Sequence, residues 1–124
     1  MKYLCLIYHN EDRVTAMGTD EYEALCVKAL EYEEELQKSG RLILAEPLQS
    51  VETATLLRVQ NNGQVSITDG PFAETKEQLA GFFLIEASDL NEAIRIASQI
   101  PPARLGCVEV RPIRQLPRKE PQSK

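Results

Sequence analysis

Two segments, residues 2–8 and 81–87, constrain the fold most, because each looks like a strand with two apolar faces. Side chains alternate between the faces of a strand. In the first segment Tyr3, Cys5 and Ile7 alternate with Leu4, Leu6 and Tyr8. In the second, Phe82 and Leu84 alternate with Phe83, Ile85 and Ala87. Both faces of a sheet containing these strands therefore need cover.

The other segments predict an α+β domain in the order β-α-β-β-β-β-α-β. Asn61-Asn62-Gly63 is a hairpin signal between two strand-like runs. Without that inserted hairpin, a split β-α-β core remains, which is the ferredoxin-like plan with an antiparallel sheet. We expect further strands at 41–48, 53–59, 65–68 and 106–113, and helices at 19–39 and 89–100.

Capping residues and apolar stripes locate the two helices. For the first we expect caps at Thr19 and Asp20, after a polar loop at 9–18, and an end at Ser39-Gly40. Ser88 or Asp89 caps the second, and Pro101-Pro102 stops it. The expected buried stripe of the first is Tyr22, Leu25, Cys26, Ala29, Leu30 and Leu36. That of the second is Leu90, Ala93, Ile94, Ala97 and Ile100.

Two helices cover one face of such a sheet, so the other face would remain in water in a monomer. Soluble monomers avoid large exposed apolar surfaces. We therefore expect an isologous homodimer packed sheet to sheet, forming a dimeric α/β barrel, with a cleft at the interface.

Composition narrows the possible partners and compartment. The chain has 124 residues, 43% of them hydrophobic, which suits one domain at 1–116 and a flexible tail at 117–124. A net charge of −5 disfavours nucleic acid, and the apolar runs are too short for a membrane span. We expect a cytoplasmic protein without metal or cofactor, whose Cys5, Cys26 and Cys107 are buried hydrophobes.

The segment 69–83 is the strongest candidate for a functional site, because a charged turn runs into a buried strand. Asp69 either forms an Asx turn or serves as a pocket carboxylate that takes a proton. Glu74, Lys76 and Glu77 form either a solvated loop or a polar pocket wall, in which Lys76 pairs with an acidic substrate.

Four more residues have a structural and a functional interpretation. Phe72 is a core plug or a substrate contact, and Phe83 packs in the core or lines an apolar pocket. Arg104 caps helix carbonyls, forms an intersubunit salt bridge or anchors a carboxylate. His9 is the one histidine, and it is either structural or the base of a reaction near neutral pH.

The chain resembles the YCII-related family, specifically its DGPF-motif branch. The likeness rests on the opening strand Met1 to Tyr8, the block Thr68-Asp69-Gly70-Pro71-Phe72-Ala73-Glu74-Thr75-Lys76-Glu77-Gln78-Leu79, Gly81, the helix at 89–100, Pro101-Pro102-Ala103-Arg104, and Val108 to Ile113. The resemblance implies a dimeric α/β barrel of ferredoxin-like subunits. It implies little about activity, since relatives of this fold include isomerases, dehalogenating lyases and cofactor-free monooxygenases. A His–Asp pair proposed in the wider family is not carried over to His9, which lies at a variable position.

Two functions follow as hypotheses. The first is a cofactor-independent enzyme that performs acid–base chemistry, of the isomerase or lyase kind, on a small molecule held at the dimer interface. Asp69 or His9 would be the base, and Lys76 or Arg104 would stabilise negative charge. The second is a non-catalytic ligand-binding or regulatory protein, linked to sigma-factor-dependent transcription.

Overall fold

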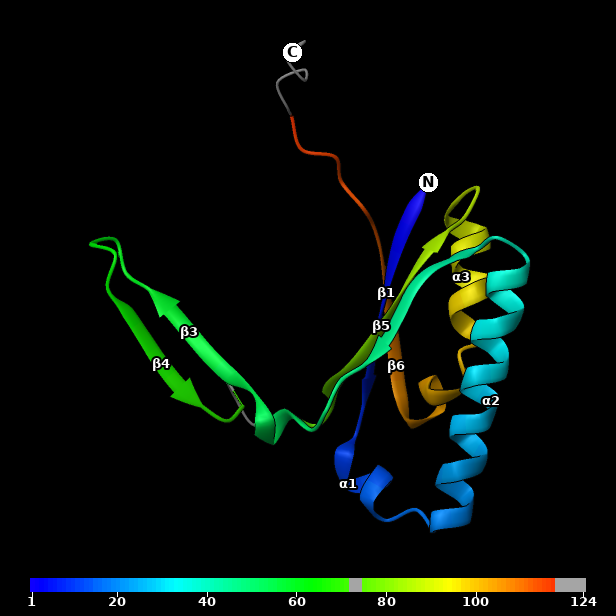
Figure 1. Ribbon diagram of the computed structural model, residues 1–124, viewed down its shortest axis with the longest axis horizontal. Helices are drawn as coiled ribbons and strands as arrows, with labels where there is room; N and C mark the ends of the chain where they lie inside the picture. The colour runs from blue at the N-terminus through cyan, green and yellow to red at the C-terminus, as the bar shows by residue number, and fades with distance from the viewer. Residues whose placement is uncertain (72–74, 118–124) are drawn as a thin grey trace.

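The computed structural model describes residues 1–71 and 75–117, which form a four-stranded antiparallel sheet, a separate hairpin and three α-helices. The sheet order is β2 (Leu42–Pro47), β5 (Gln78–Glu86), β1 (Lys2–His9), β6 (Gly106–Pro112). The two segments with two apolar faces are the central strands β1 and β5 (Figure 1). The predicted α+β class is confirmed, and so is the predicted order of strands and long helices along the chain.

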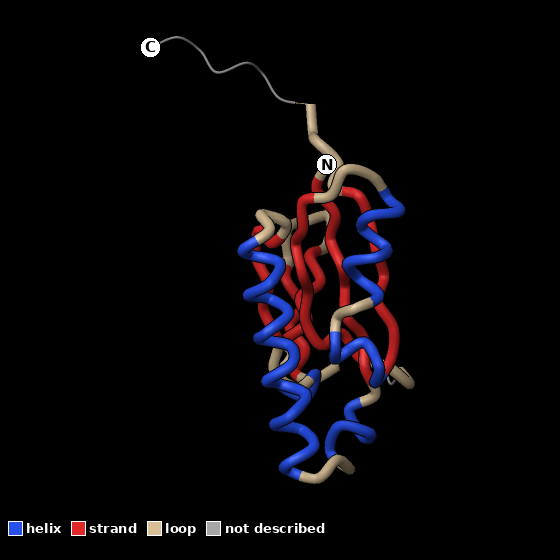
Figure 2. The backbone as a smooth tube through the Cα atoms, turned by 90° about the vertical axis from the view of Figure 1, so that its right-hand side faces the viewer, coloured by secondary structure: helices blue, strands red, loops and turns tan. Residues whose placement is uncertain are grey.

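The helices cover one face of the sheet, as expected (Figure 2). These are α2 (Thr19–Lys38) and α3 (Leu90–Ser98). Tyr3, Cys5 and Ile7 of β1 and Phe83 and Ile85 of β5 are buried beneath them. The core is completed by Leu36 of α2, by Ala87, and by Ala93, Ile96, Ala97 and Ile100 in and after α3.

The ends of the helices follow the local sequence in most places. Asp89 accepts a hydrogen bond from the Glu92 amide at 2.8 Å, and Glu92 accepts one from the Ser88 amide at 2.9 Å, so α3 begins with a reciprocal cap. The helix α2 ends before Gly40, whose φ of 75° is the left-handed conformation that glycine adopts readily.

Three expectations about the helices were wrong. The segment 9–18 is not wholly a loop, because Asn10 caps a short helix, α1 (Glu11–Thr15). The N-cap of α2 is Gly18, without a side-chain hydrogen bond, so Thr19 and Asp20 lie inside the helix. In α3 the buried stripe includes Ile96, while Leu90 and Ile94 are about half exposed because the sheet lies under the other side of the helix.

The hairpin of β3 (Thr55–Val59) and β4 (Val65–Asp69) stands apart from the sheet. Residues 60–64 close it, with the Gln60 amide donating to the Gln64 carbonyl at 2.8 Å. Figure 1 shows the hairpin extending away from the domain on the side opposite to the helices. The hairpin prediction is therefore confirmed, and the structure adds the direction in which it extends.

The second face of the sheet carries an apolar surface, and none of the helices in the described part of the chain lies over it. Leu4 is paired with Leu84, and Leu6 with Phe82, so the four side chains share this open face.

Cys107, in β6, is exposed, which corrects the expectation that all three cysteines are buried. Cys5 is buried and Cys26 half buried.

Candidate functional site between helix α2 and the sheet

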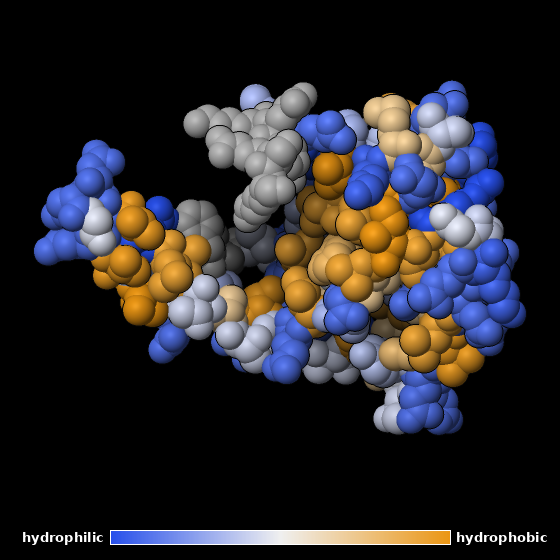
Figure 3. Space-filling view, turned by 45° about the horizontal axis from the view of Figure 1, so that its top comes forward, coloured by the Kyte–Doolittle hydropathy of each residue, from blue (hydrophilic) through white to orange (hydrophobic). Residues whose placement is uncertain are grey.

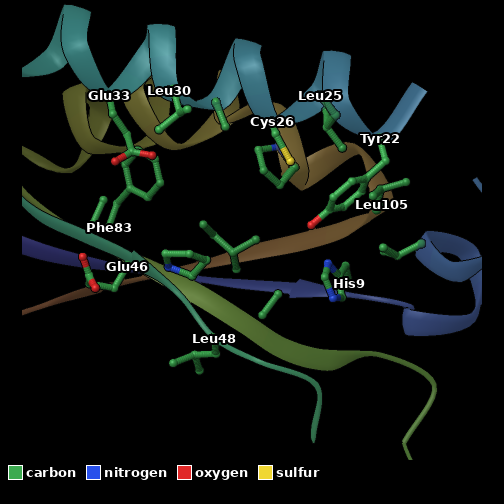
Figure 4. Close-up of a pocket in the computed structure, with 17 residues that line it drawn as sticks. His9, Tyr22, Leu25, Cys26, Leu30, Glu33, Glu46, Leu48, Phe83 and Leu105 are labelled. Atoms are coloured by element: carbon green, nitrogen blue, oxygen red, sulfur yellow. The ribbon is translucent and has the colours of Figure 1, made fainter. Parts of the chain in front are cut away.

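A cavity of about 300 Å³ lies between α2 and the helix-covered face of the sheet (Figure 4). Its walls are largely apolar, with Leu25 and Ala29 above and Ile7 and Phe83 below. Ligand pockets in proteins are typically concave, apolar and supplied with a few polar groups. Five polar or ionisable side chains line this one: His9, Tyr22, Cys26, Glu33 and Glu46.

The cavity exists because α2 contacts the core near its C-terminal end and stands off the sheet toward its N-terminal end. Near the C-terminal end Leu36 is buried, and the Tyr32 hydroxyl donates to the Ile96 carbonyl of α3 at 2.6 Å. Farther back along the helix, Tyr22 is 46% exposed and Leu30 is 64% exposed, although both belong to the predicted buried stripe. The apolar stripe of α2 thus borders a space.

His9 lies at one end of the cavity, where β1 ends (Figure 4). It pairs with Gln78 of β5 and with Gly106 of β6. A Cβ at position 106 would lie 2.0 Å from the Tyr8 carbonyl oxygen, so only glycine permits β6 to approach this end of β1. Three strands therefore hold the backbone of His9 in place.

The electrostatics of His9 favour its neutral form. Burial lowers the pKa of His9 below its ordinary value, because the protein interior disfavours the charged imidazolium. Nearby Glu11 acts in the opposite direction. A neutral imidazole has one ring nitrogen free to accept a proton, which is the state that a general base requires.

Glu11 connects this end of the cavity to the segment that leads into the hairpin. Its carboxylate accepts hydrogen bonds from the Ser50 hydroxyl at 2.7 Å and the Val51 amide at 2.9 Å. The Val51 amide lowers the pKa of Glu11 by stabilising the charged form, and the Ser50 hydroxyl adds to this effect. The helix α1 and the chain after β2 are therefore joined beside His9.

Two carboxylates, Glu33 and Glu46, line the opposite end of the cavity (Figure 4). Burial raises the pKa of Glu33, and the charge of Glu46 raises it further. A proton, or a positively charged or hydrogen-bond-donating group, would relieve this repulsion. The cavity is thus polar at two ends and apolar between them.

The cavity contains two of the residues predicted from sequence, His9 and Phe83. Asp69, Lys76, Glu77 and Arg104 do not line it, and Phe72 and Glu74 lie outside the described residues. Asp69 ends the hairpin and is exposed, as are Lys76 and Arg104. The functional roles assigned to these residues stay predictions.

Glu77 lies on another surface, close to β6. It accepts a hydrogen bond from the Cys107 thiol, with 3.4 Å between Sγ and Oε1. This contact raises the pKa of Cys107, because the carboxylate disfavours a neighbouring thiolate.

Sequence reasoning missed Glu33 and Glu46, and it assigned Leu25, Cys26 and Ala29 to an ordinary core stripe. A weak signal was present: the helix stripe has small residues at Cys26 and Ala29, opposite the small Ala45 of β2. Small side chains that face each other leave space between a helix and a sheet. Nothing in a single sequence indicates that this space remains open.

The described residues contain neither a cluster of metal-binding side chains nor a helix suited to a membrane. No three His, Cys, Asp or Glu side chains in residues 1–71 and 75–117 come together as metal ligands would. None of the helices in that part of the chain combines the length and hydrophobicity needed to cross a bilayer.

Comparison with known proteins shows the family of the chain. A YCII-related domain matches residues 1–117. An uncharacterised protein of Rhizobium meliloti (strain 1021) is 35% identical over 115 residues, which cover 91% of this chain and 92% of that protein. The match extends from the first strand through the last, and therefore includes both His9 and the helix that lines the cavity. The chain belongs to the YCII-related family.

Proposed function

We propose that the protein binds a small, mostly apolar molecule between α2 and the sheet, and that His9 takes a proton from it. The observation that carries this proposal is the half-buried imidazole at the end of an apolar cavity of about 300 Å³. That volume suits a ligand at the small end of the usual range, such as a single-ring or short-chain compound.

The chemistry that fits is proton abstraction without a bound cofactor, as in an isomerisation or elimination. A substrate would place its apolar body against Phe83 and Leu25 and an acidic C–H or O–H near His9. Glu33, whose pKa is raised, is suited to hold a proton and return it at the other end. Non-catalytic binding of a metabolite in the same cavity is the alternative.

A ligand screen tests the binding step. A panel of small aromatic and aliphatic acids, alcohols and amines would be added at millimolar concentration, with thermal unfolding and methyl NMR of Leu25, Ala29 and Ile7 as readouts. We expect at least one chemical class to raise the melting temperature and shift these methyl signals. A panel that leaves all three methyl groups unchanged would contradict the proposal.

His9→Gln separates catalysis from binding. Glutamine retains polarity but cannot act as a base near neutral pH. For an enzyme, the variant binds the same ligand while deuterium exchange at the acidic position of the ligand is lost. Equal deuterium exchange in wild type and variant would contradict proton abstraction by His9, and it would leave the binding proposal unaffected.

We further propose that the chain belongs to the DGPF branch, on the strength of Asp69-Gly-Pro-Phe72, and that it forms the dimeric barrel expected from the sequence. The support for a dimer is the open sheet face, where Leu4, Leu6, Phe82 and Leu84 are half buried and no helix of residues 1–71 and 75–117 lies above them. A second copy packed on this face would complete their burial. A role in transcription and a cytoplasmic location stay predictions.

A further inference from the structure

The hairpin β3–β4 has an apolar face that none of the described helices or strands of its own chain covers. Leu57 pairs with Ile67, and Val59 with Val65, so these four side chains lie on one face. Their exposures are 57%, 66%, 70% and 53% in that order. Within the described residues, β3 and β4 make extensive contacts only with each other.

A two-stranded hairpin of this kind is not stable alone in water, and it needs a third strand or another surface against its apolar face. Two facing pairs of aliphatic side chains are also unusual for a segment that serves only as a surface connection, since such connections are generally polar. The sequence of the hairpin therefore indicates that another surface covers it.

The position of the hairpin indicates which surface that is. It extends on the side of the sheet opposite to the helices, which is the side of the open face (Figure 1). Figure 3 shows hydrophobic residues both on the hairpin and on the body of the domain. Among the described residues, two apolar surfaces therefore lie on the same side of the sheet: the open face of the sheet and the exposed face of the hairpin.

We propose that the hairpin is an arm that reaches across to a second copy of this chain and packs its Leu57–Val59–Val65–Ile67 face on that copy. The inference rests on the homodimer proposed above and extends its interface beyond the sheet. A two-fold axis gives both arms the same environment, so one pair of surfaces satisfies both copies. A second copy is favoured over an unrelated partner because this chain itself supplies the complementary apolar surface.

Neighbouring residues on β4 provide a matched test. Ile67→Lys places a charge on the apolar face of the arm, and Thr68→Lys places the same charge on its other face. Both positions are exposed in the single chain, so neither variant should unfold the domain. Sedimentation velocity over a dilution series would measure the dimer dissociation constant. We expect Ile67→Lys to weaken the dimer roughly tenfold or more, and Thr68→Lys to change it little.

Hydrogen exchange provides a second readout on the unmodified protein. Amides of residues 55–69 should be protected in the dimer and should lose protection on dilution to the monomer. Isotope-filtered NOEs between labelled arm methyls and an unlabelled copy would show the contact directly.

The possible outcomes separate the arm from the dimer. If Leu6→Lys on the open face abolishes the dimer while Ile67→Lys behaves like Thr68→Lys, the dimer stands and the arm proposal fails. If the wild type is a monomer at tens of micromolar, both the dimer proposal and the arm proposal fail.

Discussion

Filling the cavity should stabilise the protein and exclude its ligand. Ala29 lies on α2, lines the cavity and is half buried, so Ala29→Leu would direct three more carbon atoms into the space. Burial of a methylene contributes about 0.8 kcal/mol, so complete burial of the three would contribute roughly 2.4 kcal/mol. Because the cavity is partly open to solvent, we expect about half of this value, or about 1 kcal/mol.

Ala24 provides the control, because it lies on the same helix and is exposed. Leucine has almost the helix propensity of alanine, so Ala24→Leu should leave stability nearly unchanged. Unfolding entropies of ordinary domains scale to roughly 0.26 kcal/mol/K for a chain of this length. A gain of about 1 kcal/mol therefore corresponds to a rise in melting temperature of roughly 4 °C for Ala29→Leu.

Urea and thermal unfolding would measure the stability of both variants, and methyl NMR with indole or toluene as probe would measure access to the cavity. We expect Ala29→Leu to be more stable and to lose the probe-induced shifts, while Ala24→Leu retains them. A loss of more than 1 kcal/mol in Ala29→Leu would mean that the site is already filled. Unchanged probe shifts would mean that the probe binds elsewhere. Either result would contradict the proposal that the space beside Ala29 is open and binds small molecules.

Three further predictions concern the surroundings of the cavity. Tyr32→Phe removes the hydroxyl that donates a hydrogen bond to the Ile96 carbonyl, and it should lower the free energy of unfolding measured in urea by about 1 kcal/mol. An unchanged free energy of unfolding would mean that this hydrogen bond does not stabilise the position of α2. Glu33→Gln should raise the melting temperature at pH 7, because a raised carboxyl pKa means that the charged form is unfavourable in the folded state. This gain should vanish below the ordinary pKa of 4.5, and a gain that persists in acid would show that the charge of Glu33 is not its cause. Glu11→Gln should lower the stability at pH 7, because the lowered pKa of Glu11 contributes stability above pH 4.5 that is lost as the pH falls through the folded pKa. The variant should match wild type in acid, and equal stability of the two proteins at both pH values would contradict the stabilising hydrogen bond from the Val51 amide.

The prediction of the site was partial for a physical reason. His9 was recognisable because an imidazole at the end of a buried strand is the natural base near neutral pH, and Phe83 because it belongs to a strand with two apolar faces. The turn at Asp69 was chosen because charge lies next to an apolar run, yet the structure places Asp69 at the end of the hairpin, away from the cavity. Adjacency along the chain does not establish adjacency in space where a hairpin extends outward.

By itself, the sequence determined the features that depend on neighbouring residues. The alternation in residues 2–8 and 81–87 required central strands, Asp89 and Glu92 began a helix, and Gly40 ended one. The tertiary structure alone decided how far α2 stands from the sheet, and hence that Glu33 and His9 share one cavity. It also decided that the hairpin points to the open side of the sheet. These distances depend on how whole elements pack, since Tyr32 and Leu36 hold one end of α2 while its other end borders a space that no local pattern records.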